Sequence, residues 1–141
     1  MTPRHCHAYK QVEVGTADQG TLIILLYDGA IHFLRLAKQR HQERNYEARG
    51  KLIVRVQDIV AELLNCLNMD AGQIAHSLKS IYCYMLRRLI HADLDKDVEA
   101  IEEVISLLSK LREAWMVVFG KEELAEAGAA PPASAGIGRV V

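Results

Sequence analysis

Proline is nearly missing from this chain of 141 residues, because it occurs only at Pro3, Pro131 and Pro132. A β-rich or α/β fold needs a turn every few residues, and proline is one of the residues that make turns. The proline-free stretch therefore favours long helices. The length corresponds to one domain, and the apolar share of 50% with 25% charged residues is typical of a soluble globular protein.

An excess of basic residues is also absent, since 17 Lys and Arg face 18 Asp and Glu, for a net charge of −1. Nucleic-acid-binding proteins carry such an excess to neutralise phosphates, so no nucleic-acid partner is predicted. The longest uncharged apolar run, Thr21–Tyr27, is far shorter than the roughly 20 residues that a membrane span needs. The N-terminal residues contain no apolar core of a secretory signal. We expect no membrane insertion.

Cysteine is scarce, and the three residues Cys6, Cys66 and Cys83 form no C-x-x-C pair. An odd number without such a pair predicts no disulfide framework and favours a reducing cytoplasm. Cys66 and Cys83 are flanked by apolar residues, so we expect both to be small buried hydrophobic residues. The chain is therefore expected to be cytoplasmic.

Motifs that carry catalysis or cofactors are missing as well. The sequence has no Glu-x-x-His pair for a di-iron site, no C-x-x-C-H haem motif and no glycine-rich phosphate loop. No nucleophile and base stand at a spacing that argues for catalysis, so we expect no enzyme, no catalytic residue and no cofactor. His5, Cys6 and His7 form the one local cluster of metal-binding types. We expect a weakly chelating chain end there, with a metal or redox protein as the alternative.

Four helical segments are present instead, with apolar residues repeating at spacings of three and four. They cover approximately residues 17–43, 47–67, 71–92 and 96–118, with expected caps at Thr16, Asn45, Asp70 and Asp95. Short links make consecutive helices antiparallel neighbours. The prediction is an all-α protein, an antiparallel up-down-up-down four-helix bundle over residues 16–119. A flexible extended N-terminal segment (1–15) precedes it, and a Gly/Ala/Pro-rich disordered tail (120–141) follows it.

Two features exceed what a plain bundle needs. The apolar arcs are wide, because Val104 and Leu107 lie outside the main stripe of the last helix. Extra apolar surface on a monomer marks a partner site, although the alternative is that these residues cover a self-association interface or are merely half-buried. The segment before the first helix alternates apolar with polar residues and bears Tyr9 and Val12. It is either a strip that covers an apolar groove or a frayed terminus.

Several spaced motifs resemble one family, the flagellar secretion chaperones of the FliS type. Ala8–Val12 resembles its A-Y-x-x-V element, and Leu25–Ile31 contains its L-Y-D-G-A-I signature. Ile81–Met85 resembles its L-Y-D-Y-M motif, with Cys83 where the family often has aspartate. Leu111–Trp115 completes the pattern. Their order and spacing together make the resemblance specific.

The resemblance implies a cytoplasmic, non-enzymatic chaperone built as an antiparallel four-helix bundle. Its client would be the disordered C-terminal segment of flagellin, held before export through the flagellar type III secretion apparatus. An anti-sigma factor and a component of the export gate are further implied partners. In such proteins the N-terminal tyrosine can cover part of the client groove, and the matching residue here is Tyr9, with Val12 beside it.

Wheel geometry adds candidate client contacts on the helices. The expected exposed or half-exposed contacts are Leu64, Ile90, Val104, Leu107 and Leu111. We expect four residues to hold the bundle together instead, namely Tyr27, Asp28, Tyr82 and Trp115, since aromatic rings pack while their polar tips form hydrogen bonds. The competing hypothesis is a dimerising helical scaffold or regulatory binding protein that holds no client.

Overall fold

The computed structural model describes the backbone of residues 16–128 and the side chains of residues 20–120. This part consists of α2 (Thr16–Gln42), α3 (Tyr46–Asn65), the short 3-10 helix η1 (Met69–Ala71), α4 (Gln73–Leu94) and α5 (Val98–Gly128). No strand occurs within the described range. The predicted all-α class is confirmed. The predicted lid residues Tyr9 and Val12 lie outside the described residues, as does His5–His7.

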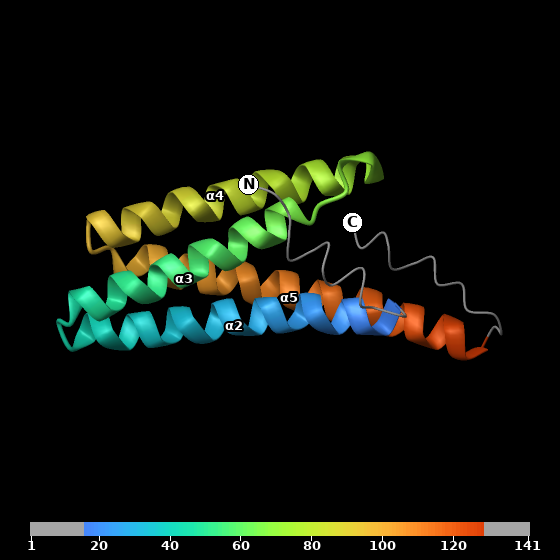
Figure 1. Ribbon diagram of the computed structural model, residues 1–141, viewed down its shortest axis with the longest axis horizontal. Coiled ribbons are helices and arrows are strands. Elements are labelled where there is room, and N and C mark those ends of the chain that lie inside the picture. Colours follow the sequence, from blue (N-terminus) through green and yellow to red (C-terminus); the bar gives the residue numbers. More distant parts are fainter. Residues whose placement is uncertain (1–15, 129–141) are drawn as a thin grey trace.

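The four long helices form the predicted bundle (Figure 1). Each helix runs opposite to the one before it, which gives the up-down-up-down order. α2 packs against α3 and α5, and α4 packs against the same two helices from the other side. α2 and α4 therefore occupy opposite corners of the bundle, and α5 continues beyond the ends of its neighbours (Figure 1).

The core lies along the common axis of the four helices. Its largest fully buried side chains are Tyr27, Tyr82, Leu34, Ile53, Met85, Leu89, Ile101 and Leu108. Together with Ala30, Val56, Val60 and Val104, which are also fully buried, they recur at spacings of three and four along each helix, so each helix turns one apolar stripe inward. The hydrophobic effect over this stripe is what drives the helices together.

Two of the predicted helix caps are wrong, and one is confirmed. The side chain of Asn45 accepts a hydrogen bond from the Ala48 amide at 3.2 Å, as a cap does. Asp70 does not cap α4, because it lies within η1 and α4 begins after Gly72. Gly72 has a φ of 91°, a left-handed conformation that glycine adopts without the steric penalty of a Cβ.

The second wrong cap is Asp95, which ends α4 instead of beginning α5. Asp97 takes that role, since its Oδ1 accepts hydrogen bonds from the amides of Glu99 at 3.0 Å and Ala100 at 3.3 Å. α5 also runs to Gly128, past the end expected near residue 118. The helix therefore continues into the segment that was expected to be a disordered tail.

One segment of α2, Gly20–Gln42, is long and apolar enough to cross a membrane by length and composition alone, with a mean hydropathy of 1.4. Tyr27, Ala30 and Leu34 of this segment are fully buried in the bundle. Because the core helix of a soluble protein passes the same test, the segment is only a weak indication of a membrane span.

Cys66 and Cys83 are not the free, buried thiols that the sequence predicts. Cys66 at the end of α3 takes part in a disulfide bond, so the prediction of a free thiol is wrong there. Cys83 on α4 is free and half-buried. Cys83 therefore reaches solvent more than a core residue does.

Candidate functional site

A chain of hydrogen bonds joins three helices inside the core. The Tyr27 and Tyr82 hydroxyls lie 2.5 Å apart, and Trp115 Nε1 donates to the Tyr27 hydroxyl at 3.1 Å. Burial raises the pKa of Tyr27 and raises that of Tyr82 further, because a phenolate would lose its hydration there. The contacts link α2, α4 and α5, the role expected of these three residues.

Asp28, the fourth residue expected to hold the bundle, lies at the surface between α2 and α5. Arg112 donates to it through Nε at 2.5 Å and through Nη2 at 3.4 Å. The pair lies in a shallow cleft of about 450 Å3 lined by Asp28, Ile31, His32, Arg35, Ser109, Arg112 and Glu113. Charged and polar groups dominate this lining, so the cleft does not suit an apolar segment.

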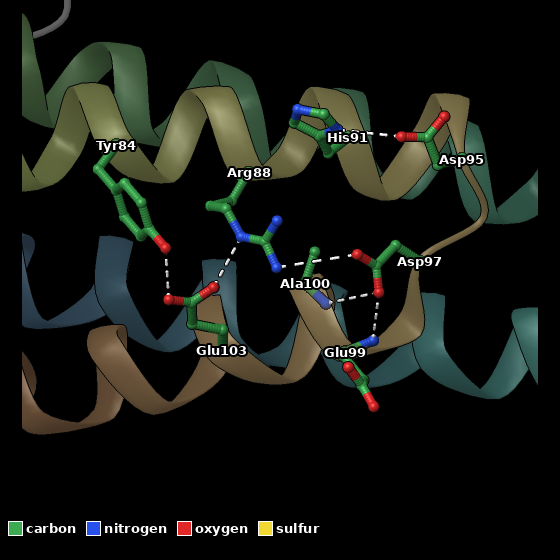
Figure 2. A network of polar contacts seen from close by, with 8 residues as sticks. All are labelled: Tyr84, Arg88, His91, Asp95, Asp97, Glu99, Ala100 and Glu103. Atoms are coloured by element: carbon green, nitrogen blue, oxygen red, sulfur yellow. Dashed lines mark hydrogen bonds and ion pairs between the residues drawn. The ribbon is translucent and has the colours of Figure 1, made fainter.

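A polar network lies on the opposite side of α5, between α5 and α4 (Figure 2). Tyr84 donates to Glu103 Oε2 at 2.6 Å, and Arg88 Nε donates to Glu103 Oε1 at 2.7 Å. These two hydrogen bonds lower the pKa of the Glu103 carboxyl, with that from Tyr84 the larger cause. Arg88 also lies 3.8 Å from Asp97. The network fixes the contact between the two helices and shows which face of each meets the other.

Leu107 and Leu111 follow Glu103 at spacings of four, so they lie on the same side of α5. Both are half-buried and pack against the core, as does Ile81, three residues before Tyr84 on α4. We call Ile81, Leu107 and Leu111 the α4–α5 strip. It continues the line of the polar network along the contact between the two helices.

A second apolar strip lies on the other side of α4. Arg49 of α3 donates to the Asp93 carbonyl at 2.9 Å, which places Asp93 at the contact between α3 and α4. Leu86 and Ile90 precede Asp93 at helical spacings and share that face. Leu64 of α3 and Leu86 are half-buried against the core, and Ile90 is 49% exposed. We call Leu64, Leu86 and Ile90 the α3–α4 strip.

The predicted contacts on the helices are therefore divided between two faces. Leu64 and Ile90 belong to the α3–α4 strip, and Leu107 and Leu111 belong to the α4–α5 strip. Val104 belongs to neither, because it is fully buried, and the expectation that it is exposed is wrong. It stands four residues before Leu108 and shares its inward face, since the core stripe of α5 is rotated from the one expected.

Three residues that the sequence does not single out join helices at the surface, namely Arg88 and Glu103 between α4 and α5 and Arg112 between α2 and α5. Their charges are visible in the sequence, but the partner of each lies on another helix, so no local spacing predicts the pair. Among residues 16–128, no group of three or more His, Cys, Asp or Glu side chains is placed to hold a metal ion.

Comparison with known proteins adds an independent finding. A family model described as "Flagellar protein FliS" matches residues 2–122 of the chain. The chain is 36% identical over 125 residues to the flagellar secretion chaperone FliS of Salmonella typhimurium, covering 84% of this chain and 93% of that protein. It is 33% identical over 115 residues to the protein of that name from Bacillus subtilis, covering 82% and 86%.

Proposed function

Because the chain belongs to the FliS family of flagellar secretion chaperones, we propose that it is a cytoplasmic, non-enzymatic export chaperone for flagellin. In this proposal it binds the disordered C-terminal segment of flagellin and prevents premature polymerisation. It then delivers the client to the flagellar type III secretion apparatus. An export gate component and an anti-sigma factor are the further partners that the family resemblance implies.

One observation on the described residues supports client binding, namely the pair of apolar strips that flank α4. An amphipathic segment that becomes helical lays its apolar face into such a groove, while its polar face stays in water. Ordering a disordered client costs conformational entropy, so a large contact area is needed to offset it. A client that crosses α4 reaches both strips, which gives more area than either strip alone.

The N-terminal segment is proposed as a lid. Tyr9 and Val12 carry this role by their match to the family motif, and the proposal is that they compete with the client for an apolar groove. Tyr9→Ala is expected to leave the helix content unchanged and to alter the affinity for flagellin. Calorimetry on the variant measures the affinity, and an unchanged dissociation constant would contradict a lid or groove role for this residue.

The test of the function is titration of the full chain with a synthetic peptide of the flagellin C-terminal segment from the same bacterium. One-to-one binding with a gain of helicity in circular dichroism is the expected result. A peptide of scrambled sequence and equal composition is the matched control, and it should not bind. A folded bundle that does not bind the native peptide would overturn the proposal.

The scaffold hypothesis makes a different prediction for the same material. A bundle that only dimerises is indifferent to removal of residues 1–15, whereas deletion of a lid changes the dissociation constant for flagellin. Calorimetry and light scattering on the truncated chain separate the two, because one reports client affinity and the other reports the mass of the free protein.

A further inference from the structure

The charge on α4 is of one sign over most of its length. Between Gln73 and Ala92 the helix carries Lys79, Arg87 and Arg88 and no acidic residue. The neighbouring α3 carries both signs, with Lys51 and Arg55 beside acidic residues on the same helix. α4 is thus a basic ridge on a chain whose net charge is only −1.

Two of these three cations have no ionic partner among the side chains of residues 20–120. Arg88 pairs with Glu103 and Asp97 in the network of Figure 2. Lys79 and Arg87 are exposed and make no ion pair with any residue of the described chain. The guanidinium of Arg87 lies 5.9 Å from the centre of the Tyr84 ring, a contact that leaves its charge unneutralised.

Lys79 and Arg87 lie next to the two apolar strips. Lys79 stands seven residues before Leu86, so it lies on the side of α4 that carries the α3–α4 strip. Arg87 lies beside Tyr84 and Arg88, next to the face that carries the α4–α5 strip. Lys79 and Arg87 therefore border the two apolar strips on the solvent side of α4.

We propose that the solvent face of α4 docks an acidic amphipathic segment of the client, whose carboxylates pair with Lys79 and Arg87 while its apolar side chains enter the flanking strips. The proposal rests on the proposed function and narrows it to the chemistry of the bound segment. Complementary charge speeds encounter and selects the partner and register, and the apolar strips supply contact area. A basic segment would meet like charge at this ridge.

The test uses the full chain and the flagellin C-terminal peptide, with calorimetry at about 50 mM and about 500 mM salt. The double variant K79Q/R87Q should weaken binding about tenfold at low salt, since two exposed ion pairs are lost. The difference should shrink at high salt, because exposed charges are screened there. A peptide with its acidic residues changed to amides should reproduce the loss on the unchanged protein.

The matched control is R35Q/R44Q, which removes the same charge from two exposed arginines of α2 and the α2–α3 loop that make no ion pair within the described chain. It should bind as the unchanged protein does. Equal weakening by both variants would reduce the effect to net charge and overturn the proposal, as would an unaffected K79Q/R87Q. If the unchanged protein fails to bind the peptide, the proposed function itself fails, so the two failures are distinguishable.

Discussion

At the scale of single residues, the hydroxyls of the two core tyrosines differ in the number of hydrogen-bond contacts that they make. The Tyr27 hydroxyl contacts both Tyr82 and Trp115, whereas the Tyr82 hydroxyl contacts Tyr27. Tyr27→Phe therefore removes the partner that the Tyr82 hydroxyl and Trp115 Nε1 share, and Tyr82→Phe deprives the Tyr27 hydroxyl of one of its two partners. We expect losses in the free energy of unfolding of about 3 kcal/mol and about 1 kcal/mol respectively.

Urea unfolding followed by circular dichroism measures both losses, and the double variant completes a cycle that isolates the coupling between the hydroxyls. Tyr46→Phe, at the rim of the bundle, serves as the control for loss of a tyrosine hydroxyl. Equal losses for Tyr27→Phe and Tyr82→Phe would contradict the asymmetry seen in the contacts.

Burial of the same hydroxyls also predicts a response to alkaline pH. The pKa of both tyrosines is raised by burial above the ordinary value of 10.0. Below about pH 10 both the folded and unfolded states hold these protons, so the free energy of unfolding does not depend on them. Above it the unfolded chain releases them first, so stability falls as pH rises toward the folded-state pKa values.

Between about pH 9 and about pH 11, the free energy of unfolding should therefore fall more steeply with pH for the unchanged protein than for Tyr82→Phe. Urea unfolding curves taken at several pH values measure this slope. Lysines titrate in the same window in both proteins, so the difference between the two curves is the quantity to compare. Parallel curves would show that the Tyr82 proton is not held more tightly in the folded state.

At the scale of the helices, the choice between Asp95 and Asp97 decides how α5 begins. Asp97 accepts two amide hydrogen bonds and lies near Arg88, whereas Asp95 forms one exposed contact with His91. Asp97→Ala should lower the free energy of unfolding by about 1–2 kcal/mol, the usual cost of losing a helix cap. Asp95→Ala should cost less than about 0.5 kcal/mol. Thermal unfolding by circular dichroism measures both, and a larger loss for Asp95→Ala would contradict the assigned cap.

These helix ends also show what sequence alone can decide. Asn45 was predicted correctly because it is the one favoured cap residue directly before its helix. Before α5, by contrast, the chain has three aspartates at alternate positions, Asp93, Asp95 and Asp97. Each of them can cap a helix, so the cap is decided by the point at which the backbone reverses direction. The expected end of the last helix near residue 118 is wrong for another reason, because α5 continues through Gly120 and an isolated glycine weakens a helix without stopping it.

At the scale of the whole molecule, the bundle and its order followed from the helical spacings and the short links, and the contact faces did not. A wide apolar arc on a helical wheel does not say which edge of the arc turns inward. That edge is set by packing against three other helices at once. Val104 was for this reason assigned to the surface although it is fully buried, while Ile90 was correctly expected to be exposed.

Because Val104 is buried and Ile90 is exposed, substitutions at the two positions should have different effects, one on the stability of the bundle and the other on client binding. Val104→Ala removes buried methyl groups and should cost about 2 kcal/mol of unfolding free energy, with flagellin affinity unchanged while the bundle stays folded. Ile90→Asp places a carboxylate at a half-exposed position, so its cost in stability should stay within about 0.5 kcal/mol. It should weaken peptide binding about tenfold, because a charge then enters the apolar contact of the α3–α4 strip.

Urea unfolding and calorimetry on the same two samples test this separation, with Leu25→Asp as the surface control, because Leu25 is an exposed apolar residue of α2, at the opposite corner of the bundle from α4. Binding through both strips also predicts that Leu107→Asp weakens the peptide complex from the other side of α4. If Ile90→Asp and Leu107→Asp both leave the affinity unchanged while the bundle remains folded, the client does not cross α4. The exposed apolar strips would then serve a contact other than the one with this client.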